Sequence, residues 1–297
     1  MPLRLHSPRL HSPRRRVAAA LVAAAAGLTT LASTAADAAP PRLVPTAEAR
    51  AAGVQAGNAT MGWKHQAPDA GRSPSSESTS TDLRTMAFVP SGVLGIDVSS
   101  WQGHVNWEAH RADGKRFAYV KATEGTGYKN PYFSSQYTGS YRAGLIRGAY
   151  HFALPSSSSG KTQAAYFARN GGGWSADGRT LPGALDIEYN PYGATCYGLS
   201  KTAMVTWVKS FVTEYKRLTT RDAVIYTTTD WWTRCTGNSQ AFSRTNPLWL
   251  ARYGTSPGTL PGGWGWATFW QYTNVPLDQN RFSSTYTRLK VLATDPG

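Results

Sequence analysis

Residues 183–188 of this 297-residue chain read Gly-Ala-Leu-Asp-Ile-Glu, a short apolar run that carries two carboxylates. Side chains two apart on a strand share a face, so Asp186 and Glu188 point together, while Leu185 and Ile187 point to the opposite face. A buried strand bears the desolvation cost of carboxylates only for a reason. Two carboxylates held close raise one pKa, which keeps one group protonated as a general acid beside an anion. Glycoside cleavage requires this division of labour.

Strand-like and helical patterns alternate on both sides of this run. The strand-like runs begin at Val93, Phe117, Leu145, Gly183, Ala223, Leu248 and Ala267. Residues 132–143, 160–169 and 200–218 have spacing compatible with helices. This alternation predicts βα units around a parallel sheet. After Ala223 the helical pattern fades into turn-rich sequence, so we expect an α/β barrel that is mostly β at its end.

Polar residues near other strand ends extend the carboxylate pair into a candidate site. Asp97 lies between two β-branched residues near the end of the first strand, and Tyr150 and Tyr226 occupy comparable places. The carboxyl ends of the strands carry the chemistry of α/β barrels, so these side chains are expected at one mouth. The arrangement predicts an acidic cleft that binds sugars.

Eight ordered blocks in residues 93–297 resemble glycoside hydrolase family 25, the secreted lysozymes that cleave peptidoglycan as N-acetylmuramidases. The blocks are, in family order, GIDVSSWQG, FAYVKATEGTGYKN, RGAYHF, LDIE, VIYT, LWLARY, FWQY and LDQNRF. The NGGGW segment and the sequences around Cys196 and Cys235 are similar to those of the secreted actinobacterial type.

The resemblance implies a fold, an activity and a set of site residues. The fold is a distorted, incomplete TIM-like barrel, (β/α)5(β)3, formed by residues 93–297 as a single catalytic domain. The activity is hydrolysis of the β-1,4 bond between N-acetylmuramic acid and N-acetylglucosamine. Glu188 matches the general acid and Asp186 its partner carboxylate, while Asp97 and Asp278 match acids of the first strand and of the late barrel. Expected sugar-binding residues are Tyr150, Tyr226, Trp101, Trp270 and Tyr272.

Two routes remain open for the second carboxylate. In one, Asp186 orients the 2-acetamido group of the substrate as it attacks the anomeric carbon, and configuration is retained. In the other, Asp186 or Asp278 attacks directly. The chain departs from the family just before Asp278, where residues 273–277 form a link that is often longer.

The first 38 residues have the pattern of a secretory signal peptide. Residues 14–16 are arginines, about fifteen mostly small apolar residues follow from Val17, and residues 36–38 read Ala-Asp-Ala. We therefore expect cleavage before Ala39 and a secreted, extracellular protein. A membrane anchor is the alternative, and the arginines permit either Sec or twin-arginine export.

Residues 39–92 are rich in Ala, Ser, Gly and Pro. They hold only Trp63 and Phe88 among the 11 Trp, 15 Tyr and 9 Phe of the chain. So little apolar surface does not offset the entropy of ordering the chain. The composition predicts a flexible propeptide or linker, whose effect on activity the sequence leaves open.

The charge balance indicates anionic partners. The chain has 31 Lys+Arg and 17 Asp+Glu, a net charge of +14, and loss of residues 1–38 leaves about +10. A basic exported protein attracts peptidoglycan and anionic cell-wall polymers rather than nucleic acid, although the charge serves solubility alone in the alternative reading. The only long apolar run is at the N-terminus, so no stable membrane insertion is expected.

Few residues suggest other chemistry. Cys196 and Cys235 predict a disulfide in an exported protein, with a nucleophilic thiol as the alternative. His104, His110 and His151 show no zinc-hydrolase spacing, so no metal and no cofactor is expected. No coiled-coil heptads occur, and a monomer is the expectation.

Two other functions compete with a muramidase. A glycosidase that acts on chitin or on the glucosaminyl bond would use the same carboxylate pair. A non-catalytic wall-binding protein would not need Glu188 and Asp186, and both are present.

Overall fold

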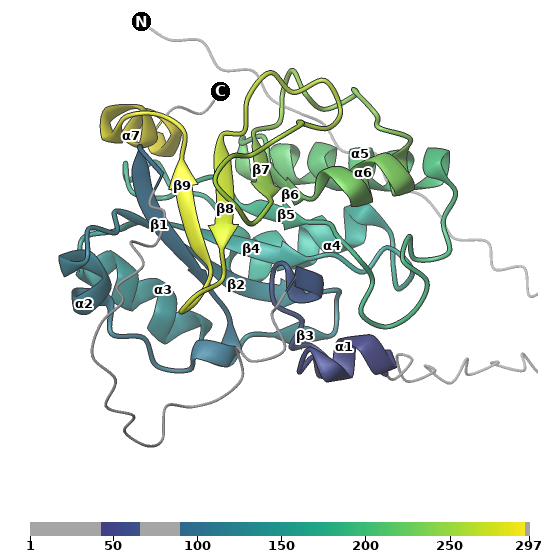
Figure 1. Cartoon of the computed structure of the whole chain (residues 1–297), viewed down its shortest axis with the longest axis horizontal. Helices are drawn as coiled ribbons and strands as arrows, with labels where there is room; N and C mark the ends of the chain where they lie inside the picture. The colour runs from purple at the N-terminus through teal and green to yellow at the C-terminus, as the bar shows by residue number, and fades with distance from the viewer. Residues whose placement is uncertain (1–42, 66–89, 295–297) are drawn as a thin grey trace, which may run out of the picture. The chain divides into compact units, whose positions relative to one another are not determined.

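The computed structural model describes residues 43–65 and 90–294, and its central feature is a sheet closed into a barrel (Figure 1). The barrel strands are β1 (Val93–Val98), β2 (Phe117–Glu124), β4 (Ile146–Phe152), β5 (Ala184–Asp186), β6 (Val224–Thr227), β7 (Leu248–Ala251), β8 (Phe269–Thr273) and β9 (Gln279–Phe282). Each strand pairs with the next, and both β2 and β9 pair with β1, which closes the ring. Pairing is parallel from β1 to β8 and antiparallel on both sides of β9.

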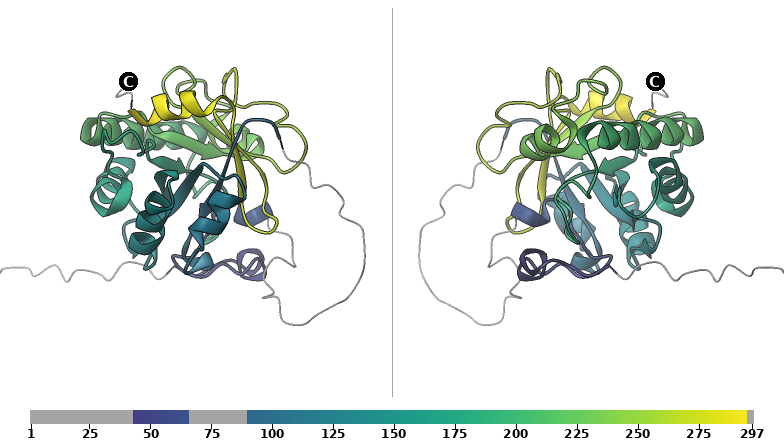
Figure 2. Two further views of the ribbon diagram at one scale, coloured as in Figure 1. Left: turned by 90° about the vertical axis from the view of Figure 1, so that its left-hand side faces the viewer. Right: turned by 90° about the vertical axis from the view of Figure 1, so that its right-hand side faces the viewer.

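Five helices follow the first five barrel strands and lie outside the barrel (Figure 2). They are α2 (Trp107–Ala112), α3 (Phe133–Arg142), α4 (Gly160–Phe167), α5 (Lys201–Thr219) and α6 (Thr229–Thr236). The α3 helix reaches β4 after a short strand, β3 (Tyr128–Lys129), that pairs with the end of β2. The predicted (β/α)5(β)3 barrel is therefore confirmed.

The α5 helix shows how the sequence determines this layering. The Ser200 hydroxyl accepts a hydrogen bond from the Ala203 N–H and caps the first turn. Phe211 and Tyr215 lie on the buried side of α5. They pack in one apolar cluster with Leu185 of β5 and with Ile187, which directly follows β5. The face of the 183–188 run opposite the carboxylates is thus covered by helices, as its alternation predicts.

Two helices lie where the sequence pattern predicts mostly loops, so the expectation that helices fade after Ala223 is wrong in part. The α6 helix is capped by Thr228 and buries Trp231 and Trp232. The α7 helix (Tyr286–Thr294) buries Leu289. Both helices are short, and neighbouring tryptophans are typical of strands, so tertiary burial rather than local pattern decides these segments.

Residues 43–65 are packed against the barrel. They contain α1 (Ala47–Ala51) and a 3-10 turn, η1 (Trp63–His65). Apolar side chains of Val54, Met61 and Trp63 are 4% exposed or less. The sequence predicts a flexible propeptide or linker for residues 39–92, and within it the few apolar side chains of residues 43–65 are buried against the barrel. The expected signal peptide, residues 1–38, and residues 66–89 lie outside the described residues.

Candidate active site

Four carboxylates meet at the mouth formed by the carboxyl ends of the parallel strands. Asp97 lies near the end of β1, Asp186 ends β5, and Glu188 follows two residues later. Asp278 precedes β9, and because β9 is antiparallel its start lies at the same mouth. All four are buried, with exposed fractions of 0–6%. The structure therefore brings together the four acids that the sequence singles out.

Asp186 and Glu188 are held in an environment that favours their protonated forms. Burial raises the pKa of Glu188 from 4.5 to about 8. Burial, and then the charge of Glu188, raise the pKa of Asp186 well above its usual value. The two acids share a hydrogen bond with each other, and no other described side chain satisfies the side-chain oxygens of Asp186 or Oε2 of Glu188.

Asp97 and Asp278 differ in their hydrogen bonds. Asp97 Oδ2 accepts from Asn280 Nδ2 at 2.6 Å and from Gln271 Nε2 at 3.0 Å. Burial raises the pKa of Asp97 to about 6, and the two amide donors oppose this rise because they favour the ionised form. Burial, and then the charge of Asp97, raise the pKa of Asp278 well above its usual value. Hydrogen bonds therefore favour the ionised form of Asp97, while burial and the charge of Asp97 favour the protonated form of Asp278.

Three tyrosines add neutral hydroxyl groups to the mouth. The Tyr226 hydroxyl donates to Gln271 Oε1 at 2.8 Å. The Tyr253 hydroxyl lies 3.4 Å from the same oxygen and 3.5 Å from Asp278 Oδ1. Tyr150 is fully buried beside them. Burial raises the pKa of all three well above 10, so they remain hydrogen-bonding hydroxyls and add no negative charge.

Lys121 and Glu124 form a buried ion pair on β2. Lys121 Nζ lies 2.5 Å from Glu124 Oε2, and neither side chain is exposed. The Tyr192 hydroxyl donates to the other oxygen of Glu124. The positive charge of Lys121 lowers the pKa of both Asp186 and Glu188 against the effect of burial. The pair therefore supports the strand and also acts electrostatically on the acids.

The three aromatic residues expected to stack on sugars differ in exposure. Trp101 is 44% exposed, and its indole N–H donates to the Asn58 carbonyl at 2.8 Å. Trp270 and Tyr272 on β8 are 1% and 5% exposed and lie against each other. Of the three, only Trp101 has substantial exposed surface in this structure.

The two cysteines form the predicted disulfide. Cys196 and Cys235 are bonded, with a Cα–Cα distance of 5.3 Å. The bond joins the loop after β5 to α6. A nucleophilic thiol is therefore excluded for both residues in this state.

His151 is a packed core residue. Its Nδ1 lies 2.7 Å from Thr123 Oγ1, and its Nε2 lies 2.9 Å from Gln163 Oε1. Its ring stacks on Phe211, and burial lowers its pKa to about 4. Among residues 43–65 and 90–294 no group of three or more His, Cys, Asp or Glu side chains is arranged to hold a metal ion. Over the same residues, no helix has the length and apolarity to cross a membrane.

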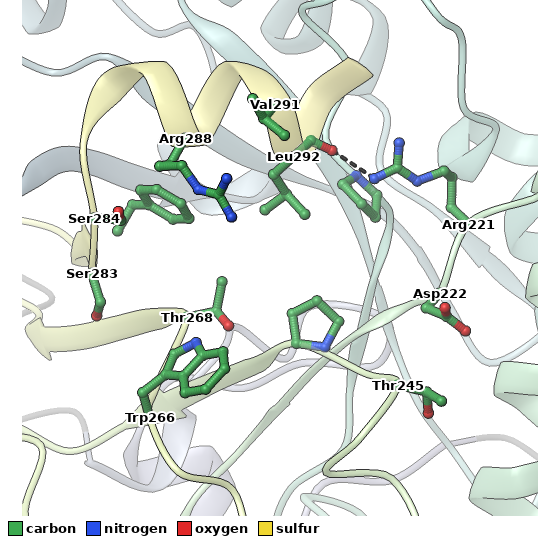
Figure 3. Close-up of a pocket in the computed structure, with 13 residues that line it drawn as sticks. Arg221, Asp222, Thr245, Trp266, Thr268, Ser283, Ser284, Arg288, Val291 and Leu292 are labelled. Carbon is green, nitrogen blue, oxygen red and sulfur yellow. Dashed lines mark hydrogen bonds between the residues drawn. The ribbon is translucent and has the colours of Figure 1, made fainter. Parts of the chain in front are cut away.

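A cavity of about 530 Å³ lies at the opposite end of the barrel from the carboxylates (Figure 3). Its lining includes Asp222 and Thr268, which precede β6 and β8, and Arg288 and Leu292 of α7. Trp266 stands at its edge and is 70% exposed. None of the four acids lines this cavity.

Sequence reasoning missed three kinds of site residue. Gln271 and Asn280 hold Asp97, and Tyr253 faces Asp278. The sequence did contain a signal for Gln271, Asn280 and Tyr253, because each lies in one of the eight blocks that resemble the family. Gly62, whose N–H donates to Glu188 Oε1 at 2.6 Å, belongs to a segment with no such signal.

Comparisons with known proteins agree with this geometry. Residues 96–280 match the family described as Glycosyl hydrolases family 25. Lysozyme M1 of Streptomyces globisporus is 54% identical over 213 residues, which are 69% of this chain and 72% of that protein. N,O-diacetylmuramidase of Chalaropsis sp is 48% identical over 209 residues, or 68% of this chain and 99% of that protein. The solved bacterial lysozyme from Streptomyces coelicolor has 53% identity and a TM-score of 0.68, covering 70% of this chain and 99% of that structure.

Proposed function

The chain belongs to glycoside hydrolase family 25 and is a lysozyme, and from that premise we propose how its carboxylates act. The reaction is hydrolysis of the β-1,4 bond between N-acetylmuramic acid and N-acetylglucosamine in peptidoglycan. Glu188 is the general acid that protonates the glycosidic oxygen. The observation that carries this assignment is the pKa of about 8 that burial gives Glu188, so the group holds a proton at neutral pH.

Asp186 assists the acetamido group of the substrate. Of the described residues only Glu188 shares a hydrogen bond with Asp186, so Asp186 keeps acceptor capacity for an amide N–H of the substrate. An acetamido N–H held in this way turns its carbonyl oxygen toward the anomeric carbon. Attack by that oxygen breaks the glycosidic bond and forms a cyclic intermediate, and the leaving sugar keeps the proton from Glu188. Water then gives a proton to the Glu188 carboxylate and opens the intermediate, so configuration is retained. Direct attack by Asp186 or Asp278 on the anomeric carbon is the alternative route.

Asp97 and the tyrosines position the sugar and complete the charge balance. Burial raises the pKa of Asp97 to about 6, and two amide donors oppose that rise, so Asp97 is ionised above about pH 6. This anion lies at the mouth where positive charge develops on the sugar ring in an oxocarbenium-like transition state. The neutral hydroxyls of Tyr150 and Tyr226 supply hydrogen bonds to sugar oxygens.

The disulfide and the net positive charge fit an enzyme that acts outside the cell. Disulfides persist in oxidising compartments, and the signal pattern of residues 1–38 supplies a route there. We place the protein in the extracellular space, as a monomer drawn to anionic wall polymers.

Identifying the new chain ends tests the proposed bond specificity. Purified peptidoglycan is digested, the new reducing ends are reduced with borohydride, and the reduced sugar is identified by mass spectrometry. Muramitol is expected. Glucosaminitol would mean that the other bond is cleaved. If a protein whose active site is open to substrate releases no new ends but still binds the walls, it is a wall-binding protein instead.

A further inference from the structure

The segment of residues 43–65 lies across the mouth of the barrel that holds the four acids. Its α1 helix, purple in Figure 1, lies beside β3. Its chain then passes two strand ends at that mouth, because Ala59 hydrogen-bonds to Glu124 at the end of β2, and Gly62 and Trp63 hydrogen-bond to residues 188 and 189 after β5. These contacts join residues that are more than 60 positions apart in the sequence.

Gly62 reaches the proposed general acid itself. Its N–H donates to Glu188 Oε1 at 2.6 Å. A Cβ atom at this glycine would lie 2.8 Å from the Tyr253 hydroxyl, 3.0 Å from Gln271 Oε1 and 3.1 Å from the Tyr226 hydroxyl. The backbone of Gly62 is therefore wedged among the polar atoms that would otherwise bind a sugar. Its φ of +67° is also a conformation that favours glycine.

Residues on both sides of Gly62 fix it there. Met61 is fully buried and joins the cluster inside the barrel that contains Tyr150 and Tyr226. Trp63 is 2% exposed, and its indole N–H donates to the Tyr189 carbonyl at 2.8 Å. The segment thus fills the barrel mouth with an apolar side chain and anchors itself with an aromatic one.

The same segment covers other parts of the site. The Ala59 N–H donates to Glu124 Oε2 at 3.3 Å, and Lys121 Nζ donates to the Ala59 carbonyl. Asn58 accepts from the Trp101 indole through its carbonyl, and the Gly57 N–H lies 3.1 Å from the Tyr192 hydroxyl. Trp101, the exposed aromatic residue expected to stack on a sugar, is therefore already hydrogen-bonded to residues 43–65 through Asn58.

The barrel does not need this segment to complete its fold. The family match begins at residue 96, and the solved S. coelicolor lysozyme is covered over 99% of its length by 70% of this chain. Each strand and helix of the (β/α)5(β)3 barrel lies beyond residue 92. The segment is an addition that occupies the site rather than a structural part of it.

We infer that residues 43–65 are an autoinhibitory plug: they occupy the substrate site of the lysozyme and keep it inactive until they are displaced. The inference rests on the proposed function of that site. A glycan strand and the plug compete for Glu188 and for the tyrosine hydroxyls, and covalent attachment gives the plug a high local concentration. Activity is therefore reduced to the fraction of molecules in which the plug is out.

The test is a Gly62→Val substitution in the full chain. The added side chain meets three fixed polar groups and disfavours the positive φ, so it should expel the plug. The matched control is Ala56→Val, which adds similar bulk at an exposed position of the same segment. Neither residue belongs to the proposed catalytic machinery. The initial rate of release of new reducing ends from soluble peptidoglycan fragments is measured for each, and Gly62→Val is expected to be about tenfold faster or more, with the control unchanged.

Hydrogen exchange at residues 59–63 reports the position of the plug independently of activity. Slow exchange is expected in the wild type and the control, and fast exchange in Gly62→Val. Trp63→Ala, which removes an anchor without touching an acid, is the second variant if Gly62→Val does not fold.

The outcomes separate the inference from the proposed function. Fast exchange at residues 59–63 with a rate no higher than that of the wild type would overturn autoinhibition while leaving the lysozyme activity in place. Fast exchange with no new reducing ends in any variant would overturn the proposed function, and the inference with it. Fast exchange with an increased rate supports both.

Discussion

Glu188 and Asp97 show how the same kind of group acquires opposite charge states in one site. Both are buried, but Asp97 accepts two amide hydrogen bonds from side chains, and its pKa is about 6. Glu188 accepts one backbone hydrogen bond at Oε1 and otherwise shares a hydrogen bond only with Asp186 among the described residues, and its pKa is about 8. Burial raises the pKa of both acids, and the amide donors on Asp97 oppose the rise and favour its ionised form.

Glu188→Gln should remove the proton donor with little change in shape. A positioned general acid contributes about 10²–10⁴-fold to a rate, so a loss of that size in turnover of peptidoglycan is expected. The matched control is Glu108→Gln, at an exposed position in the first turn of α2. Both changes are made in the wild-type and Gly62→Val chains. Wild-type turnover by Glu188→Gln would show that another group protonates the leaving oxygen.

The raised pKa of Glu188 also makes stability depend on pH. The unfolded chain loses this proton near pH 4.5, while the folded chain keeps it to about pH 8. Unfolding therefore releases a proton within this window, and the free energy of unfolding falls as pH rises through it, by at most about 1.4 kcal/mol per pH unit. Urea unfolding from pH 5 to 8 should show a smaller decline for Glu188→Gln than for the wild type. Equal slopes would mean that Glu188 is ionised in the folded chain.

At the level of secondary-structure elements, the direction of β9 decides which residues reach the site. Because β9 is antiparallel, the residue before it, Asp278, lies at the mouth where β1 and β5 end. Asn280, two residues further on, then lies within 2.6 Å of Asp97. A parallel final strand would have put both residues at the far end of the barrel, where Figure 3 shows the cavity under α7.

The disulfide ties two elements of the outer layer together. The double variant Cys196→Ala/Cys235→Ala should unfold at lower urea concentration, because the bond closes a loop of 39 residues in the unfolded chain. The chain-entropy relation gives about 4 kcal/mol for a loop of this length. The free energy of unfolding from urea titration, with the single variants as controls, measures the loss. An unchanged midpoint would mean that the bond adds no net stability.

The charge of the molecule concerns its approach to the wall rather than the reaction. The chain carries +14 overall and about +10 without residues 1–38, while four acids are concentrated at one mouth. We propose that the excess of basic side chains attracts anionic wall polymers at long range. The plug adds a second level of control, because attraction to the wall alone does not expose Glu188.

Wall binding should weaken strongly with salt. Glu188→Gln protein, which is expected to degrade its target about 10²–10⁴-fold more slowly, is pelleted with walls between about 0.01 M and 1 M NaCl. Over this range the Debye length falls from about 30 Å to about 3 Å. The bound fraction is expected to fall, and walls stripped of anionic polymers should show a smaller fall. Binding that is insensitive to salt would assign retention to sugar contacts instead.

Much of the barrel and its acids followed from local pattern. The alternation at residues 183–188 correctly separated Asp186 and Glu188 from the side chains under the helices, because a strand alternates its faces whatever surrounds it. The short helices α6 and α7 did not follow, because burial of Trp231 and Leu289 against the barrel outweighs their weak local preference. The roles of Gln271 and Asn280 also depended on the pairing of β8 with β9.

The sequence by itself predicted an α/β barrel, the Asp186–Glu188 pair and the disulfide, because these depend on side-chain alternation and residue type, while the (β/α)5(β)3 class and Asp278 came from the resemblance to the family. Tertiary structure alone decided which acids hold protons, since burial and amide donors from distant strands set each pKa. It also decided the fate of residues 43–65. Their composition gives them no core, and only the barrel mouth supplies the buried surface and the Glu188 carboxyl that hold Met61 and Gly62 in place.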